Sequence, residues 1–205
     1  TKKLCWNCPN LILDNQINYS IIRKLLAFEG ELGKKDIAAQ FEEIKDKTFV
    51  YNSSKNSSCL VELDEAPPYS INKNALKAAI QVAILLNMKL VNEIIVMRKI
   101  VIDGSNVSGY QRTALISRNW FIETSKVKIK IPTLYLEEDA AQKIEETKDE
   151  VKYNIARLGI PLLEISTSPE IQDPEHAKET AFLIGMIIKS TGLTNRGIGS
   201  VRQDI

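Results

Sequence analysis

The chain has 205 residues, of which 44% are hydrophobic and 26% are charged, a balance typical of a globular protein large enough to bury a core. Its 27 Lys and Arg residues and 26 Asp and Glu residues give a net charge of +1. The protein as a whole therefore has no electrostatic field that would attract nucleic acid or a membrane. With no apolar run of about 18 residues and an odd number of cysteines, we expect a cytoplasmic protein with reduced thiols and no membrane partner.

The first part of the chain is predicted to contain short elements. The spacing of apolar residues predicts helices over residues 17–24 and 30–47. The β-branched and aromatic residues of 49–63 predict two short strands around a turn rich in Ser and Asn.

The middle of the chain is predicted to hold a helix followed by a strand. Residues 74–87 are apolar on most helical faces, so we expect this helix to be buried, with Asn72 or Asn74 as its N-cap. Residues 92–103 are rich in β-forming types, and "GSNVSG" after them predicts a loop.

The last third begins with residues 127–136, whose period of two predicts a strand, and "GIPLLEIST" predicts another. Asp173 as N-cap and Pro174 at the first helical position then open a helix that stops at Thr191 and Gly192.

The order of elements favours an α+β fold with a mostly antiparallel sheet. Residues 193–205 complete it with a predicted hairpin turn and a last strand. We expect residues 1–205 to form one domain, and the chain, which runs from Thr1 to Ile205, to be a piece of a longer protein that is incomplete at both ends.

Acidic residues in or beside predicted strands are the first candidates for a functional site. Glu137 and Glu138 end one strand, Glu164 lies inside "PLLEIS", and Asp204 follows "SVRQ". A carboxylate in an apolar strand is unfavourable unless a cation or a hydrogen-bond donor meets it. Because Mg2+ binds one or two carboxylates together with phosphate oxygens and water, a shared face of these acids would suit a nucleotide–metal site.

Each of these acids also has a simpler interpretation. Glu137 and Glu138 can open a helix over "EEDAAQKIEETKDE", where acids favour the positive N-terminal end. Glu164 can face solvent from an edge strand, and Asp204 can be a turn residue.

Cationic and amide side chains that could complement phosphate are Arg98, Lys99, Gln111, Arg112, Asn154, Arg157, Arg196 and Arg202. Phosphoryl transfer needs chiefly positioning and charge neutralisation, so a metal- and ATP-dependent transferase or ligase is permitted by these residues. Taken singly, each arginine can equally be an ordinary surface charge.

The cysteines and the single histidine do not predict a zinc site or a hydrolytic active site. Cys5 and Cys8 have the spacing of half a zinc site and Cys59 is a third thiol, but we do not expect a complete four-ligand site, since His176 lies in a predicted helix. His176 has a surface context among "DPEHAKE", so a hydrolytic triad is not supported either.

Several motifs together resemble a known family. They occur in order as "CLVELDEAPP", "VMRKIVIDGSNVSGYQRTALI", "LEEDAA", "RLGIPLLEISTSPEI" and "GIGSVRQDI". They resemble the GatB/GatE family, and within it the archaeal GatE type of glutamyl-tRNA(Gln) amidotransferases. The GatB type, from the three-subunit Asp/Glu-tRNA amidotransferase, is the alternative, although it typically has an aromatic and proline-rich stretch where this chain has "DGSNVSGYQRT".

The resemblance implies a cradle similar in fold to glutamine synthetase and guanidino kinases. It implies that ATP and Mg2+ phosphorylate the side chain of glutamate misacylated onto tRNA(Gln), and that ammonia channelled from an asparaginase-like partner of the amidotransferase displaces the phosphate. The alternatives are a non-catalytic tRNA-binding or assembly module and a ligase acting on a small carboxylate. The family's upstream Glu-Ile-His motif and its later tRNA-binding domains are absent from these 205 residues.

Site roles follow from the same resemblance, position by position. The implied metal-binding acids are Glu137, Glu138, Glu164 and Asp204. The implied catalytic residues are Glu138, Glu164 and Arg157. The residues expected near ATP are Asn154, Lys99, Arg112 and Arg202.

Overall fold

The structure is a computed structural model that describes residues 6, 16–30, 32–195, 197 and 200–204. The chain forms two compact units. Unit 1 comprises Thr1–Asn72, Met97–Arg112 and Glu138–Leu162, and unit 2 comprises Lys73–Val96, Thr113–Glu137 and Leu163–Ile205. Within the described part of the chain, no helix combines the length and the apolar character needed to cross a bilayer.

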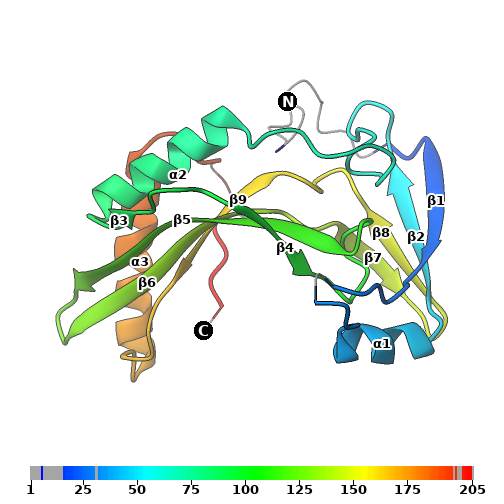
Figure 1. The fold of residues 1–205 in the computed structure, drawn as a ribbon. Coiled ribbons are helices and arrows are strands. Elements are labelled where there is room, and N and C mark those ends of the chain that lie inside the picture. The colour runs from blue at the N-terminus through cyan, green and yellow to red at the C-terminus, as the bar shows by residue number, and fades with distance from the viewer. Residues whose placement is uncertain (1–5, 7–15, 31, 196, 198–199, 205) are drawn as a thin grey trace. The chain divides into compact units, whose positions relative to one another are not determined.

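Unit 1 is built on a four-stranded sheet (Figure 1). Its strands lie in the order β1 (Tyr19–Lys24), β2 (Thr48–Ser53), β8 (Glu150–Asn154) and β7 (Gln142–Glu146). β2 and β8 are parallel, whereas the pairs at both sides are antiparallel. The core of the unit consists of Phe49, Tyr51, Leu63, Ala141, Val151, Tyr153, Ile155 and Leu158.

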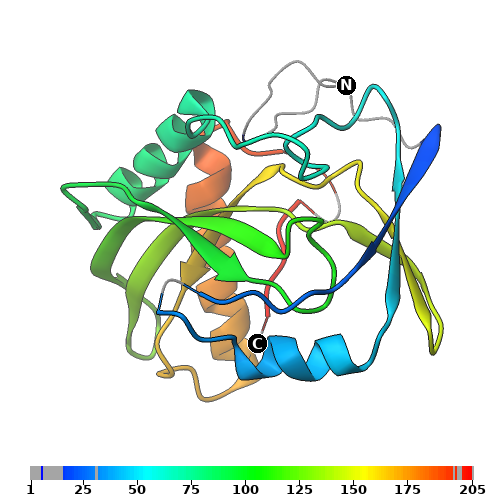
Figure 2. The same ribbon diagram turned by 45° about the vertical axis from the view of Figure 1, so that its right-hand side comes forward.

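The helix α1 (Ile37–Ile44) connects β1 to β2 and lies at one end of these strands (Figure 2). It begins where the Asp36 side chain accepts a hydrogen bond from the backbone N–H of Ala39, which satisfies one free donor of the first turn. The sequence predicts a helix here, and the structure confirms a shorter one than residues 30–47.

Two predictions for the first 63 residues are wrong. Within residues 17–24, Tyr19–Lys24 forms β1 rather than a helix, because Tyr19 and Ile21 alternate with exposed residues and pack against the core of the unit. The second strand expected within 49–63 is replaced by turns after β2, where Ser53 and Ser58 are buried and bonded to each other.

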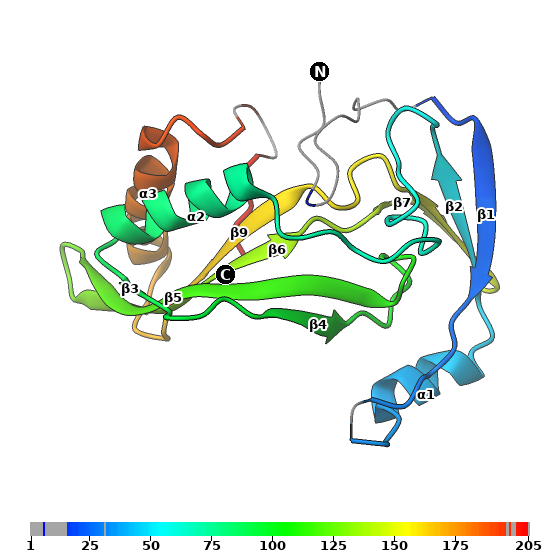
Figure 3. The ribbon, with the colours of Figure 1, turned by 45° about the horizontal axis from the view of Figure 1, so that its top comes forward.

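Unit 2 contains most of a second sheet and two helices that contact each other (Figure 3). The helices are α2 (Lys73–Leu85) and α3 (Pro174–Ser190). The sheet order is β3 (Lys89–Leu90), β5 (Tyr110–Glu123), β6 (Lys128–Glu138) and β9 (Pro161–Ser166), and β4 (Val96–Ile100) also pairs with β5. The largest fully buried side chains of the unit include Val82, Leu86, Ile116, Ile129, Ile131, Leu134 and Leu136.

Most predictions from residue 73 onward are confirmed. The helix α2, the strands β4, β6 and β9, and the start of α3 at Pro174 lie where the sequence predicts them. The Asp173 side chain accepts from the backbone N–H of His176 at 3.0 Å, which confirms the predicted N-cap. The α+β fold with mostly antiparallel pairing is confirmed as well.

One strand is missed and two further expectations fail. The long strand β5 is not predicted, and the helix proposed for "EEDAAQKIEETKDE" is wrong because residues 142–154 form the antiparallel pair β7 and β8. In the part of 193–205 that the structure describes, no residue belongs to a strand, so the expected last strand is not observed there.

Candidate active site

Two buried carboxylates end β6. Because consecutive residues of a strand point to opposite faces, Glu137 and Glu138 have different surroundings. The Oε1 atom of Glu137 accepts a hydrogen bond from the hydroxyl of Thr113 at 3.1 Å, and these two residues are partners in the β5–β6 register.

Glu138 forms an ion pair with Arg112 across the same two strands. The Nε of Arg112 donates to Oε2 of Glu138 at 2.7 Å, its backbone N–H donates to the same oxygen at 3.2 Å, and its terminal Nη2 donates to Oε1. Gln111 adds a bond from its side-chain amide to the backbone carbonyl of Glu138 at 2.7 Å. Both oxygens of this carboxylate therefore face one guanidinium, a bidentate geometry that neutralises the buried charge.

Two further groups extend this arrangement. The Trp6 ring lies 6.0 Å from the Arg112 guanidinium, and the Trp6 backbone N–H donates to the carbonyl of Gly159 at 2.7 Å. The Nε of Arg157 donates to the carbonyl of Ala140 at 3.1 Å and lies 3.7 Å from Oδ2 of Asp139. We call Trp6, Gln111, Arg112, Glu138, Asp139 and Arg157 the Glu138 network; all six belong to unit 1.

The loop that the sequence predicts at "GSNVSG" supports the segment after Glu138. The carbonyl of Ser105 accepts from the backbone N–H of Ala141 at 2.9 Å. The Tyr51 hydroxyl donates to the carbonyl of Gly104 at 2.7 Å, and the Tyr153 hydroxyl donates to the carbonyl of Asp103 at 2.6 Å. Burial raises the pKa of both tyrosines well above the ordinary value, so each stays a hydrogen-bond donor.

Gly104 fits this loop because of its conformation and its surroundings. Its φ is +78°, and a Cβ built on it would lie 2.3 Å from the Phe49 ring. Only glycine meets both conditions without displacing the aromatic core, so the "DGSN" part of the motif is explained by packing.

The other predicted site residues are not gathered around Glu138 by any described contact. Glu164 is exposed on β9, the last strand in the sheet order, and Asp204 is exposed in unit 2. Among the described residues there is no group of three or more His, Cys, Asp or Glu side chains placed to hold a metal ion. The shared metal site of Glu137, Glu138, Glu164 and Asp204 stays a prediction.

The residues predicted near ATP have diverse surroundings. The Asn154 side chain accepts from the backbone N–H of Ala156 at 2.8 Å and thereby shapes the turn after β8. Lys99 and Arg202 are exposed. Cys59 is half-buried, whereas the zinc ligands weighed with it, Cys5 and Cys8, lie outside the described residues, as does Arg196.

His176 is not a surface residue as the sequence suggests. It is buried in the first turn of α3, and its Nε2 lies 2.8 Å from the hydroxyl of Thr124. The prediction of a surface context is wrong because this face of α3 packs on the turn between β5 and β6.

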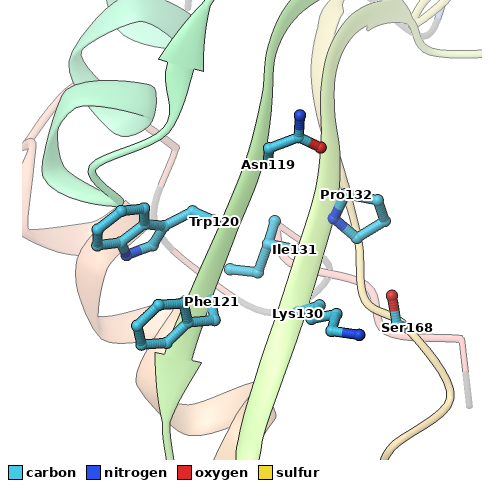
Figure 4. A pocket seen from close by; sticks show the side chains of 7 residues that line it. All are labelled: Asn119, Trp120, Phe121, Lys130, Ile131, Pro132 and Ser168. Carbon is cyan, nitrogen blue, oxygen red and sulfur yellow. The ribbon is translucent and has the colours of Figure 1, made fainter.

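Unit 2 also contains a cavity of about 300 Å³ (Figure 4). Asn119 lies beside it with a φ of +62°, and Pro132 on the neighbouring strand has no N–H to donate, so the β5–β6 ladder has no pair at this point. Trp120 and Phe121 stack with ring centroids 5.0 Å apart. No predicted site residue lines this cavity, so it does not belong to the Glu138 network.

Residues 38–205 match the family model described as the GatB/GatE catalytic domain. The chain belongs to this family. The family resemblance that the sequence motifs indicate is thereby confirmed.

Similar GatB/GatE members are named as the GatE component of glutamyl-tRNA(Gln) amidotransferase. One from Methanocaldococcus jannaschii is 50% identical over 204 residues, one from Methanococcus maripaludis strain C5 is 48% identical over 204, and one from Methanosarcina acetivorans is 47% identical over 205. Each alignment covers 100% of this chain and 32% of the relative, so the chain spans about a third of the length of these curated relatives.

Proposed function

We propose that this chain is the catalytic portion of a tRNA-dependent amidotransferase that converts glutamyl-tRNA(Gln) to glutaminyl-tRNA(Gln) in the cytoplasm. The observation that supports this function most directly is the identity of 47–50% over the whole chain to relatives named for that amidotransferase.

The reaction has two steps. The side-chain carboxylate of the tRNA-bound glutamate attacks the γ-phosphorus of ATP, forming an acyl phosphate and releasing ADP. Ammonia then attacks the acyl carbon, the C–O bond to phosphate breaks, and the amide and inorganic phosphate leave the site. The proposed source of ammonia is an asparaginase-like partner within the same amidotransferase.

The proposed phosphoryl donor is ATP with Mg2+, an ion that prefers oxygen ligands and keeps several waters. The Glu138 network does not fit Mg2+ as it stands, because both Glu138 oxygens accept bonds from Arg112 while Glu137 lies on the other face of β6. Mg2+ at Glu138 would also lie next to the positive charge of the Arg112 guanidinium, which disfavours a second cation there. Glu164 and Asp204, both exposed, remain the proposed ligands.

Arg157 is the group of the Glu138 network best suited to meet substrate. Its described contacts, to the carbonyl of Ala140 and to Asp139, both use Nε, and its side chain is partly exposed. Its two terminal nitrogens can therefore donate to an oxygen of phosphate or carboxylate, which would orient the acceptor and balance developing charge.

The test uses the complete protein, radiolabelled ATP, ammonium chloride and tRNA(Gln) charged with glutamate. We expect labelled acyl phosphate without ammonium and glutaminyl-tRNA(Gln) with it. Free glutamate serves as the control substrate: ATP hydrolysis that free glutamate stimulates as strongly as the charged tRNA would contradict the proposal and favour a small-carboxylate ligase. The binding-module alternative predicts tRNA binding without any phosphoryl transfer.

A further inference from the structure

The cavity of unit 2 lies at a break in the β5–β6 ladder. Asn119 has a φ of +62° inside the 14-residue strand β5, a conformation that strands do not use and that few residues other than glycine adopt. Pro132 lines the same cavity from the neighbouring strand. Because backbone outliers of this kind persist only where their surroundings fix them, and cluster at ligand sites, the conformation of Asn119 points to a ligand at this cavity.

Polar side chains that can donate hydrogen bonds line one part of the cavity (Figure 4). The Asn119 amide and the Ser168 hydroxyl both line it, and neither has a described hydrogen bond. The Lys130 ammonium lines it as well; its side chain is 75% exposed, and its one described contact is an ion pair at 3.9 Å with Oε1 of Glu170. An ammonium, an amide and a hydroxyl together suit a carboxylate group of a ligand.

Glu170 supplies an acceptor whose hydrogen bonding is incomplete. The backbone holds it near the cavity, because the N–H of Ser168 donates to the carbonyl of Lys130 at 3.0 Å and the N–H of Glu170 donates to the carbonyl of Ser168 at 2.9 Å. Its Oε2 is buried and has no hydrogen-bond partner among the described residues. The ion pair with Lys130 is too long for a hydrogen bond. A carboxylate left in this state is unfavourable, and a ligand ammonium group would supply the missing donors.

The rest of the cavity wall is apolar and consists of Trp120, Phe121, Ile131 and Pro132. Small-molecule sites typically combine such a wall with a few polar groups that fix the orientation of the ligand. The volume of about 300 Å³ is at the lower end of the range for ligand pockets, so it suits a molecule smaller than a nucleotide. The wall therefore favours a small ligand with an apolar part.

We propose that this cavity binds a free α-amino acid with an apolar side chain. The carboxylate of the ligand would accept from Lys130, Asn119 and Ser168, and its ammonium group would donate to Glu170. The site is separate from the candidate active site, since Lys130 precedes Glu137 by seven residues on β6, which is about 23 Å along a strand. The inference does not depend on the proposed reaction.

The test is isothermal titration calorimetry of the complete protein with L-leucine and L-phenylalanine, without ATP or tRNA. We expect saturable binding of these amino acids. Their N-acetyl and amide derivatives each lack one charged group, so both should bind at least about 10-fold more weakly. The derivatives resemble the last and the first residue of a peptide, so they also distinguish a free amino acid from a peptide terminus.

Substitutions then locate the bound amino acid. Lys130→Met and Glu170→Gln should each weaken binding at least about 10-fold, because each removes one charge that meets the ligand. The matched controls are Lys152→Met and Glu145→Gln. These residues form a strand ion pair at 2.9 Å in unit 1 and do not line the cavity, so their substitution should leave the affinity unchanged.

Three results would overturn the proposed site. Absence of binding by the wild type would show that the cavity takes neither amino acid. Equal affinity for an N-acetyl or amide derivative would show that the two charged groups of the ligand are not both read. Unchanged affinity in Lys130→Met and Glu170→Gln would place the bound amino acid elsewhere. The derivatives need only the wild type, so they judge the proposal even where a variant does not fold.

Discussion

The end of β6 and the middle of β9 present a carboxylate in opposite ways. Glu138 is buried and both its oxygens accept bonds from Arg112, whereas Glu164 is exposed on the last strand of the sheet order. A buried acid that is paired in this way stabilises the folded state, because removing its charge leaves a buried cation without its counter-ion. An exposed acid has no buried counter-ion, so its substitution should leave stability unchanged. Any loss of activity can then be assigned to function.

Glu138→Gln should have the largest effect on stability. Neutralising one partner of a buried ion pair typically costs about 3–5 kcal/mol of unfolding free energy, and urea titration measures it. The matched control is Glu137→Gln, which weakens a bond to a hydroxyl and should cost about 1 kcal/mol. Equal stabilities of wild type and Glu138→Gln would mean that the pair is not buried in solution.

The double substitution Arg112→Met with Glu138→Leu sharpens the same comparison. Apolar side chains of similar volume can replace a buried ion pair at little cost, so the double variant should be more stable than Glu138→Gln. A double variant less stable than Glu138→Gln would show that Arg112 has separate structural partners of greater weight, such as the Trp6 ring.

Gly104→Ala should have the next largest effect on stability. We expect its free energy of unfolding, measured by urea titration, to fall by about 2–3 kcal/mol. The added methyl group meets the Phe49 ring, and the positive φ disfavours alanine. Gly109 is the control: its φ is +73° but a Cβ there has nothing within 4 Å, so Gly109→Ala should lose only the conformational part. Equal effects at both positions would contradict the packing explanation.

Asp173→Ala should destabilise the start of α3 by less than Gly104→Ala destabilises the fold, and only at a pH where the Asp173 carboxyl is ionised. The Lys126 side chain and then the backbone N–H of His176 hold the pKa of Asp173 below its ordinary value. The stabilisation is therefore present above the unfolded pKa, about 3.9, and is lost as pH falls through the lower folded pKa. Hydrogen exchange in α3 measures this, and a difference from wild type that persists in strong acid would contradict it.

Glu164→Gln should have the smallest effect on stability, within about 0.5 kcal/mol of wild type, because the side chain is exposed. A loss of more than about 1 kcal/mol in thermal unfolding would mean that Glu164 has a structural partner, and the contrast with Glu138 would then fail.

The parts of the fold that the sequence predicts correctly have strong local signals. The helix α2 has apolar spacing over 13 residues, α3 adds the N-cap Asp173 and a Pro in its first turn, and β6 alternates over many residues. The strand β1 is six residues long, a length over which helical and strand periods are hard to separate. In β7 and β8 the mixture of Glu and Lys imitates the ion pairs of a helix surface.

The sequence predicts which residues of the candidate site stand out by their type, but not which residues they contact. Glu138 stands out as an acid at a strand end, but its pairing with Arg112 follows from the β5–β6 register, and β5 is not predicted because a bulge near Ile116 and the positive φ of Asn119 break its alternation. The contact of Trp6 with Arg112 joins residues far apart in the chain, and no local signal could indicate it.

The most direct test of the proposed function measures transfer of radiolabelled phosphate from ATP to glutamyl-tRNA(Gln) by the complete protein, comparing wild type with Glu164→Gln at equal folded concentration. We predict that the variant keeps the wild-type melting temperature and tRNA affinity and loses at least about 100-fold in phosphoryl transfer, as removal of a charge-stabilising group does. Undiminished transfer would contradict a catalytic role for this exposed acid, and absence of transfer by the wild type would contradict the proposed reaction itself.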